Sequence, residues 1–340
     1  MIVTVTPNPA LDFTYQLPAV HLGQSHRVLP PAVRAGGKGI NVARILHSRG
    51  VPVLSLATVG GCTGAEFESD LIVSAIPHRL THVQAATRRT MAFTESKGAR
   101  ASIFNEFGAN NTPAEWGRLT YAVETALSDA TCLVGSGSLP EGADTNFYAH
   151  LVGRAQALGI PSIVDTTGPA LLAAARAGVT LIKPNEQELT ESTGEEDSVR
   201  AARALIDLGA QNILVSLGER GMFLISAANP GEPWRGRLPR ILAGNATGAG
   251  DAAVAAAATF FSTAFSSGPA PYDVDPHTIL SLSISWSAAA VLMPLAGEIS
   301  SEQVTLATEV IISRKFVNCE ATRSPVSETK LVHHTRGVTP

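Results

Sequence analysis

Cysteine, aromatic residues and charged residues are all scarce in this chain of 340 residues. Aromatic residues make up 5% and charged residues 16% of it, and the formal net charge is −4. Its 3 cysteines, Cys62, Cys132 and Cys319, are widely separated, which excludes a disulfide framework and a Cys-x-x-Cys metal site. The small net charge argues against a nucleic-acid or membrane partner held by bulk charge, so any bound anion must be held by local groups.

Long apolar runs are also missing. The most apolar stretch, residues 252–261, is mostly alanine and is too short to span a bilayer, so it is predicted to form a buried helix. Residues 1–9 are predicted to form a short strand, and they lack the basic region and apolar run of a signal peptide. We therefore expect a reduced, cytoplasmic protein.

Short apolar segments alternate with amphipathic segments through most of the chain. The apolar ones end at Gly, Pro or polar residues and are predicted as strands: residues 2–6, 53–59, 131–135, 162–164, 179–182 and 212–216. This alternation predicts an α/β fold with a mostly parallel sheet that helices cover on both faces. Ligands of such sheets bind beyond the carboxyl ends of the strands.

Two segments interrupt this alternation. Residues 13–34 and 80–105 look like strands without intervening helices, and they are predicted to form a small sheet that serves as a lid or a dimer contact. An ordinary edge meander is the alternative. Beyond residue 316 the periodicity is lost. We therefore expect a domain of residues 1–316, with the lid strands inserted, and a flexible tail of residues 317–340.

The segment Gly244-Asn-Ala-Thr-Gly-Ala-Gly-Asp251 precedes the alanine-rich helix. Glycines before a helix allow backbone N–H groups to converge on an anion, and the helix dipole favours negative charge there. Asp251 would repel a phosphate that rests on it, but it could take the proton of an acceptor hydroxyl beside the phosphate. A capping aspartate after a glycine turn is the alternative. A dinucleotide fingerprint is less suitable, because the motif is late in the chain and contains an acidic residue.

The chain contains no GxxxxGK[ST] phosphate loop, so any use of ATP requires a different architecture. The segment Ala35-Gly-Gly-Lys-Gly-Ile-Asn-Val-Ala-Arg44 opens a helix, and its glycines permit close backbone approach. Asn41 can hydrogen-bond a sugar hydroxyl as both donor and acceptor. Tight packing of the helix on the sheet explains the same glycines.

A third motif, Lys183-Pro-Asn-Glu-Gln-Glu188, follows an apolar strand. Asn185 and Glu188 share one face of the first helical turn. The pair suits a magnesium ion that is held mainly through water, because Mg²⁺ keeps much of its hydration. Helix capping with an acidic first turn is the alternative.

Several other residues are weaker candidates when each is taken alone. Asp12 could hold sugar hydroxyls or belong to a turn. A substrate phosphate could be bound by Arg27, Lys38 and Arg88, although lone basic residues are usually solvated. A strand-end turn that suits phosphates, adenine or a plain hairpin contains Ser216, Gly218 and Gly221.

Together and in order, these motifs resemble the PfkB (ribokinase-like) carbohydrate kinases, and most closely the branch of phosphofructokinases and tagatose-6-phosphate kinases. The resemblance runs from the first strand to past residue 250. It rests on Thr6-Pro-Asn-Pro-Ala-Leu-Asp12, Gly36-Gly-Lys-Gly-Ile-Asn-Val-Ala-Arg44, Ser136-Gly-Ser-Leu-Pro140, Lys183-Pro-Asn-Glu186, Ser216-Leu-Gly218 and Gly248-Ala-Gly-Asp251. It implies a three-layer α/β/α ribokinase-like fold with a small β-sheet lid, ATP as donor and Mg²⁺ as cofactor.

The resemblance also implies roles for individual residues. Asp251 is the expected catalytic base, and the anion hole is expected from the amides of Gly248, Ala249 and Gly250. The expected sugar contacts are Asp12, Gly37, Lys38, Asn41 and Ser138. The residue that favours already phosphorylated sugars is Arg88, with Arg27 assisting. The nucleotide side is expected to be lined by Lys183, Asn185, Ser216, Gly218 and Gly221, and the metal to be organised by Asn185 and Glu188.

These roles predict an ATP-dependent hexose-phosphate kinase with fructose 1-phosphate as the favoured acceptor. Tagatose 6-phosphate and fructose 6-phosphate are alternatives, because motif spacing does not fix which hydroxyl faces Asp251. A kinase of unphosphorylated sugars or nucleosides and a catalytically silent sugar-phosphate sensor are more distant alternatives. We expect no nucleic-acid or membrane partner, and we predict a homodimer through the lid strands.

Overall fold

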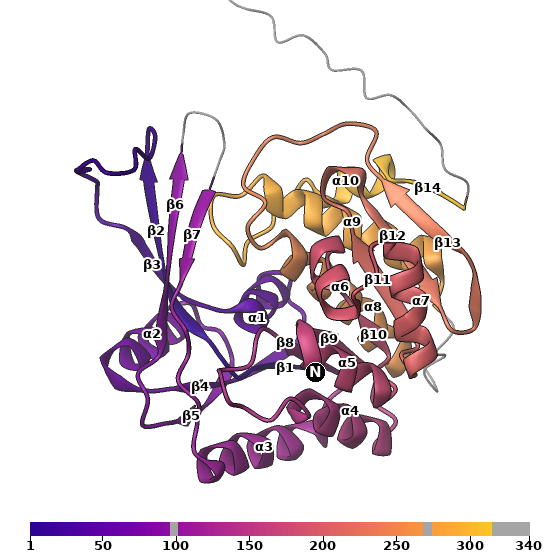
Figure 1. The fold of residues 1–340 in the computed structure, drawn as a ribbon, viewed down its shortest axis with the longest axis horizontal. Coiled ribbons are helices and arrows are strands. Elements are labelled where there is room, and N and C mark those ends of the chain that lie inside the picture. Colours follow the sequence, from indigo (N-terminus) through magenta and orange to yellow (C-terminus); the bar gives the residue numbers. More distant parts are fainter. Residues whose placement is uncertain (96–100, 268–273, 315–340) are drawn as a thin grey trace, which may run out of the picture.

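A large sheet of 10 strands runs through the middle of the molecule, as a computed structural model shows for the described residues 1–95, 101–267 and 274–314 (Figure 1). The strand order is β14-β13-β12-β11-β10-β9-β8-β1-β4-β5. Parallel pairing joins β1 (Ile2–Thr6), β4 (Val53–Val59), β5 (His78–His82), β8 (Cys132–Ser136), β9 (Ser162–Asp165), β10 (Leu181–Ile182) and β11 (Asn212–Ser216). An antiparallel edge follows, with β12 (Met222–Ser226), β13 (Asn229–Arg237) and β14 (Ile311–Ser313). The predicted, mostly parallel sheet is confirmed.

Helices cover both faces of this sheet. One face packs against α1 (Lys38–Ser48), α2 (Gly61–Val73), α8 (Ala249–Ser266), α9 (Pro276–Val291) and α10 (Gln303–Glu309). The other face packs against α3 (Pro113–Leu127), α4 (Phe147–Ala157), α5 (Gly168–Arg176), α6 (Glu186–Thr193) and α7 (Ser198–Leu208). Successive side chains of a strand point to opposite faces, so Ile2 belongs to the first apolar cluster and Val3 to the second. The predicted three-layer α/β/α architecture is confirmed.

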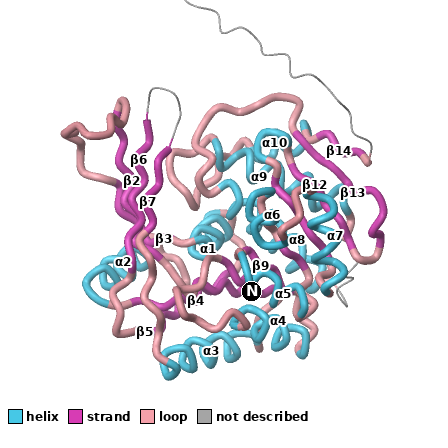
Figure 2. Tube along the Cα trace, in the orientation of Figure 1, coloured by secondary structure: helices cyan, strands magenta, loops and turns pink. Residues whose placement is uncertain are grey.

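A second sheet of 4 strands stands beside the large one (Figures 1 and 2). Its order is β3-β2-β6-β7, with β2 (Ala10–Leu17), β3 (Ala32–Gly36), β6 (Arg88–Glu95) and β7 (Ala101–Asn105). The predicted small sheet is therefore present. Its second segment begins later than predicted, because Leu80, Thr81 and His82 pair with β4 in the large sheet.

The connection between the two sheets is short. Only residues 7–9 separate β1 of the large sheet from β2 of the small sheet. β2 then pairs in parallel with β6, so that Ala10 lies opposite Arg88 and Asp12 opposite Thr90. The small sheet is thereby attached near the carboxyl end of β1, the end at which parallel sheets bind ligands.

The remaining predictions concern the alanine-rich helix, the lack of a membrane span, the cysteines and the C-terminal tail. The predicted alanine-rich helix is confirmed as part of α8, which packs against α1 and α9. Within the described ranges, no helix is long and apolar enough to cross a membrane. Cys62 and Cys132 are free thiols. The predicted tail of residues 317–340 lies outside the described residues.

Candidate active site

A cavity of about 1330 Å³ lies between the two sheets. Asp165 and Ser216 are the last residues of β9 and β11, and Lys183 follows β10, so the carboxyl ends of the parallel strands form one wall. The small sheet contributes another wall, with Asp12 and Thr90 among its lining residues. Apart from Arg27, every residue predicted for the site lines this cavity.

The predicted anion-binding turn lies at the start of α8. Gly248 has φ 86°, a left-handed conformation that glycine adopts without strain, and an added Cβ would lie 3.0 Å from Ala296. Ala252 donates the first intrahelical hydrogen bond to the carbonyl of Gly248. The N–H groups of Gly250 and Asp251 precede that bond and have no partner within the helix, so they can face an anion. The Ala249 amide differs, because it donates to the carbonyl of Ala246 at 3.2 Å.

The Asp251 carboxyl is buried in the first turn of α8 and is only 6% exposed. Asn41 Nδ2 donates to Asp251 Oδ2 at 2.8 Å, which brings two predicted residues together across the cavity floor. Burial, helped by the charge of Asp165, raises the pKa of Asp251 to about 7, although Lys38 and Lys183 act in the opposite direction. This carboxyl can therefore exchange a proton near neutral pH.

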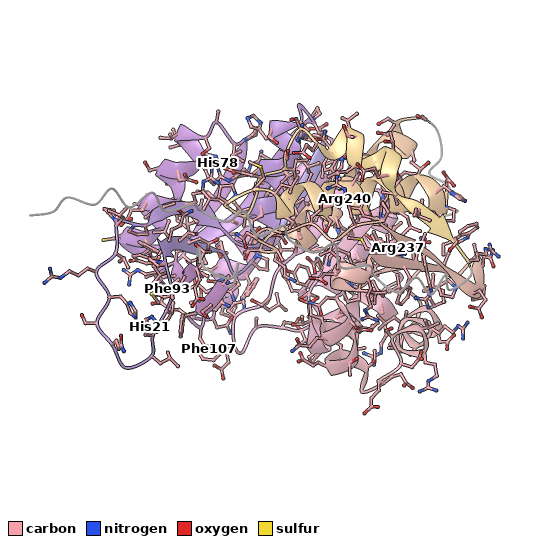
Figure 3. All side chains as sticks on the ribbon, turned by 90° about the horizontal axis from the view of Figure 1, so that it is seen from above. His21, His78, Phe93, Phe107, Arg237 and Arg240 are labelled. Carbon is pink, nitrogen blue, oxygen red and sulfur yellow. The ribbon has the colours of Figure 1, made fainter. Side chains whose placement is uncertain are left out.

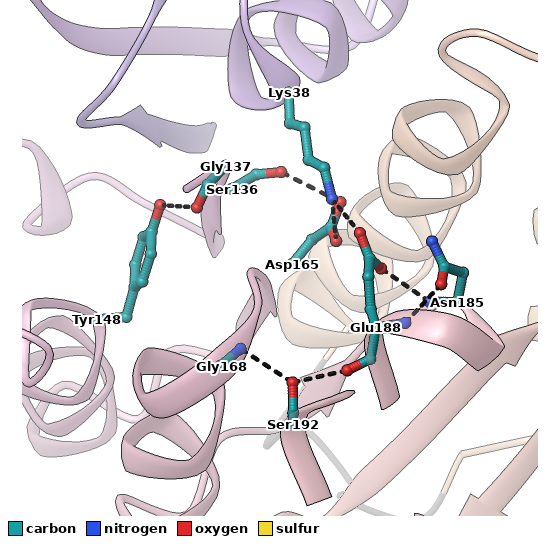
Figure 4. Close-up of polar contacts among 9 residues, drawn as sticks. All are labelled: Lys38, Ser136, Gly137, Tyr148, Asp165, Gly168, Asn185, Glu188 and Ser192. Carbon is teal, nitrogen blue, oxygen red and sulfur yellow. Dashed lines mark hydrogen bonds and ion pairs between the residues drawn. The ribbon is translucent and has the colours of Figure 1, made fainter. Parts of the chain in front are cut away.

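Lys38 connects two carboxylates in the same region (Figure 4). Its Nζ lies 3.1 Å from Asp165 Oδ1 and 3.1 Å from Glu188 Oε1. Burial opposes the ammonium charge, but these carboxylates raise the pKa of Lys38. Asp165 is 1% exposed, and although burial alone would raise its pKa, Lys38 and Lys183 lower it. Asp165 and Asp251 are thus two neighbouring carboxyls whose pKa values are pushed apart.

Asn185 and Glu188 form a capping box at the start of α6 (Figure 4). The Glu188 N–H donates to Asn185 Oδ1 at 2.8 Å, and the Asn185 N–H donates to Glu188 Oε2 at 2.9 Å. Among the described residues, no group of three or more His, Cys, Asp and Glu side chains could hold a metal ion directly. The two carboxylates around one ammonium nevertheless show that a positive charge is stabilised here. Carboxylate and amide oxygens fit a hydrated magnesium ion.

The small-sheet end of the cavity carries Asp12 and Arg88. Asp12 packs so closely on Gly36 that an added Cβ there would lie 1.9 Å from Asp12 Oδ2. Burial raises the pKa of Asp12 to about 6, while Thr90 and Arg88 act against that rise. Arg88 Nε donates to Asn8 Oδ1 at 3.1 Å, and Asn8 Nδ2 donates to Ser138 Oγ at 3.1 Å.

The opposite end of the cavity is mainly glycine and apolar side chains. A one-turn 3₁₀ helix, Gly218–Arg220, follows β11, and both Gly218 and Gly221 have positive φ. Lys183 is 3% exposed, and its Nζ lies 3.3 Å from the place of an added Cβ on Gly250. The apolar wall is formed by Met222, Leu238, Leu242, Ile284, Ala288 and Val291. Phe107 and Arg240, both labelled in Figure 3, also line the cavity.

Arg27 is the exception among the predicted residues. It lies exposed in the segment that joins β2 to β3, and it does not line the cavity. Arg27 therefore does not join the other predicted residues at this cavity, and its contact with a substrate stays a prediction. The segment leaves β2 at Leu17, the end of that strand remote from Asp12, which carries the arginine away from the site.

Among the cavity residues that were not predicted, Asp165 and Asn8 bond directly to predicted ones. Asp165 directly follows the predicted strand 162–164 and precedes Thr166-Thr167-Gly168, so its place at a carboxyl strand end was the signal that could have identified it. Asn8 stands inside the Thr6–Asp12 motif, but the partners of its side chain lie 80 and 130 residues away. No local pattern indicates such partners.

Comparison with known proteins agrees with this geometry. Residues 8–268 match the model of the pfkB family carbohydrate kinases. A curated relative from Mycobacterium tuberculosis (strain CDC 1551 / Oshkosh), ATP-dependent 6-phosphofructokinase isozyme 2, is 35% identical over 261 residues, which are 75% of this chain and 76% of the relative.

Solved structures of similar fold include phosphofructokinases. Phosphofructokinase-2 from Escherichia coli, in complex with substrates and products, superposes with a TM-score of 0.78 at 28% identity and covers 90% of this chain and 98% of its own. A possible 1-phosphofructokinase from Thermotoga maritima superposes with a TM-score of 0.79 at 22% identity, covering 92% and 98%, and this likeness concerns the fold alone.

The fold and the cavity with its glycine turn define a phosphotransferase that acts on an alcohol group. The chain belongs to the pfkB family of carbohydrate kinases, and within it to the ATP-dependent phosphofructokinase type. The resemblance inferred from the sequence motifs is confirmed.

Proposed function

We propose that this protein transfers the γ-phosphoryl group of ATP to a hydroxyl of a phosphorylated ketohexose. One observation carries the proposal: the buried Asp251 carboxyl, with a pKa of about 7, lies beside the free N–H groups that begin α8. A proton acceptor next to an anion-binding turn is what phosphoryl transfer to a hydroxyl requires.

The remaining residues fit positions on either side of this centre. Asp12, Asn41 and the backbone of Gly37 would hold the sugar, and Asp251 would take the proton of its attacking hydroxyl. The turn of Gly248–Gly250, together with Lys183, would neutralise the transferring group, since such transfer depends mainly on positioning and on charge stabilisation. Magnesium, held through water by Asn185 and Glu188, would supply further positive charge to the phosphates.

Lys38 is the residue that would connect the two substrates. Its ammonium pairs with Asp165 and Glu188, and it lines the same cavity as Asn41 and Asp251. We assign it to the transferring phosphoryl group and to the neighbouring part of the sugar. This role follows from its position at the junction of the large and small sheets.

The identity of the acceptor is a separate question. The motifs favoured fructose 1-phosphate, whereas the relatives with 35% and 28% identity are named as 6-phosphofructokinase and phosphofructokinase-2. Arg88, at the small-sheet end of the cavity, supports an acceptor that already carries a phosphate. We therefore place fructose 6-phosphate first, with fructose 1-phosphate and tagatose 6-phosphate as the alternatives.

The test is an ADP-release assay with ATP and Mg²⁺ against fructose 6-phosphate, fructose 1-phosphate, tagatose 6-phosphate and free fructose. The proposal expects turnover with one phosphorylated sugar and much less with free fructose. Equal turnover with free fructose would favour a kinase of unphosphorylated sugars. Stabilisation by a sugar phosphate without any turnover would favour the silent sensor.

A homodimer through the small sheet is our proposal for the assembly. The face of this sheet away from the cavity carries aromatic contacts, with Tyr15 stacked on Phe93 at 5.2 Å and Phe93 against Phe104 at 5.8 Å. Phe104 is 55% exposed and Val33 39%. Light scattering should give the mass of a dimer, and Phe104→Asp should shift it toward the monomer. A monomer mass for the unmodified protein would remove the proposal.

A cytoplasmic location remains a prediction from the sequence.

A further inference from the structure

Asn8 joins three segments at the small-sheet end of the cavity, although no functional role was predicted for it. It stands between β1 and β2, half-buried, and lines the cavity. Its Nδ2 donates to Ser138 Oγ at 3.1 Å, and its Oδ1 accepts from Arg88 Nε at 3.1 Å. Its backbone carbonyl accepts from Arg88 Nη2 at 3.3 Å. One residue therefore holds Arg88 by side chain and main chain together.

The backbone of Arg88 is fixed independently of Asn8. The neighbouring Thr87 accepts the Gly60 N–H on its Oγ1 at 3.1 Å, and its own N–H donates to the Gly60 carbonyl at 2.8 Å. This anchors the start of β6, but it does not orient a guanidinium at the end of a long side chain. An unrestrained arginine side chain would lose rotamer entropy on binding an anion. Asn8 therefore determines where the charged group points.

The hydrogen bonds of the guanidinium show which donors remain. Nε and one N–H of Nη2 bind Asn8, and one N–H of Nη1 binds the Glu106 carbonyl at 3.3 Å. Of the five donors of an arginine, this leaves one N–H on each terminal nitrogen. Two such donors form the fork that binds a phosphate or carboxylate bidentately.

Gly108 limits the movement of the Asn8 side chain. A Cβ added to Gly108 would lie 2.1 Å from Asn8 Oδ1, so the glycine backbone lies directly against the amide group. Any side chain at position 108 would displace the amide and break its bond to Arg88. The segment after β7 and the Ser138 turn therefore hold Asn8 from two directions.

We propose that Asn8 is a positioning residue of the acceptor site: it orients Arg88 so that the two remaining N–H groups face the phosphate that the acceptor already carries. The inference rests on the proposed function, because it assumes a phosphorylated acceptor at this end of the cavity. Asn8 acts through Arg88 and does not touch the reacting atoms.

The test compares steady-state kinetics of Asn8→Ala, Arg88→Ala and the double variant with the unmodified protein, after thermal unfolding has shown that each variant folds. Loss of a hydrogen bond to a charged group should raise the acceptor KM of Asn8→Ala roughly tenfold or more, with kcat and the ATP KM nearly unchanged. In the Arg88→Ala background the same substitution should have little further effect, because the residue that it orients is gone. A full Asn8 effect in that background would overturn the inference.

Two further variants make the test specific. Gly108→Ala leaves Asn8 in the sequence but displaces its amide, so it should reproduce the KM effect. Asn146→Ala removes an exposed asparagine at the start of α4, away from the cavity, and should leave all kinetic constants unchanged. An Asn8→Ala variant in which kcat and both KM values change together would show a general structural role and would overturn the inference.

The experiment also separates this inference from the proposed function. If the unmodified protein phosphorylates none of the sugars, the proposed function fails, and binding of inorganic phosphate is then measured by titration calorimetry on the same variants. Weaker binding in Asn8→Ala and in Arg88→Ala, without a further loss in the double variant, would support the positioning role. Unchanged binding in either single variant would overturn it.

Discussion

The two ends of the cavity are built differently. The small-sheet end presents charged and polar side chains, among them Asp12, Arg88 and Asn8, that are tied to one another or to the backbone. The other end presents glycine turns at Gly218 and Gly221 beside an apolar wall. The first end can recognise a ligand by its charge and hydroxyl pattern. The second end can recognise a flat, largely apolar group by shape and by backbone contact.

The two ends meet at a pair of buried carboxyls with opposite properties. Asp165 is held ionised by Lys38 and Lys183, whereas burial and the charge of Asp165 raise the pKa of Asp251. This division gives the site one fixed negative charge and one carboxyl that can take up a proton. The following predictions examine whether the two ends can be perturbed separately from this centre and from each other.

The largest effect is expected at the centre, from Asp251→Asn. The amide keeps the size of the carboxyl but cannot accept the proton of the acceptor hydroxyl, so kcat should fall by about 10²- to 10⁴-fold. The KM values of both substrates should change little, because neither end of the cavity is altered. Steady-state kinetics checks this. A variant that kept kcat and lost only acceptor affinity would show that Asp251 belongs to the acceptor end.

The next effect is a pH dependence of the unmodified protein. A base with a raised pKa of about 7 is active only when it has lost its proton. The value of kcat/KM for the acceptor should therefore fall about tenfold for each pH unit below 7 and level off above about pH 8.

Asp165→Asn is the control for this pH dependence. It removes the charge that helps to raise the pKa of Asp251, and it leaves Lys38 with Glu188 as its remaining ion-pair partner. The rise of kcat/KM with pH should then occur at lower pH than in the unmodified protein. A rise at the same or a higher pH would contradict the assignment of the titrating group to Asp251.

The smallest effect is expected at the apolar end, from Ala288→Leu. The larger side chain would extend from α9 into the cavity, and overpacking of this kind costs about 1–3 kcal/mol, so the ATP KM should rise roughly tenfold. The acceptor KM should remain unchanged. An equal rise of both KM values would show that the two ends are not independent.

Much of the fold follows from local sequence patterns. β1, β4 and β11 have the predicted bounds. Short β-branched runs that lie between helical segments and end at turn residues indicate strands clearly. β10 is shorter than the predicted segment 179–182. The hydroxyl of Thr180 accepts the Ser162 N–H, and this side-chain bond replaces the expected ladder at that position. A side-chain bond between neighbouring strands has no signature in the segment itself.

The residues of the candidate site were likewise predictable only where they lie in local sequence motifs. Gly248, Asp251 and Asn41 were predictable, because glycine turns before helices and the polar residues within them form compact motifs. Asp165 and Asn8 were missed because their side chains bond to Lys38 and Arg88, which are 127 and 80 residues away. Arg27 lies away from the cavity, because the position of a lone arginine depends on the course of its loop, which the sequence does not show.

The short link between the sheets has a mechanical consequence. Prolines at positions 7 and 9 fix φ on both sides of Asn8, so the link is stiff and has few ways to bend. Asn8, in the middle of the link, also accepts a hydrogen bond from Arg88 on β6, a strand of the small sheet. A rotation of the small sheet about this link would therefore change the geometry of the hydrogen bonds between Asn8 and Arg88. The tilt of the small sheet and the orientation of the Arg88 guanidinium are therefore mechanically coupled.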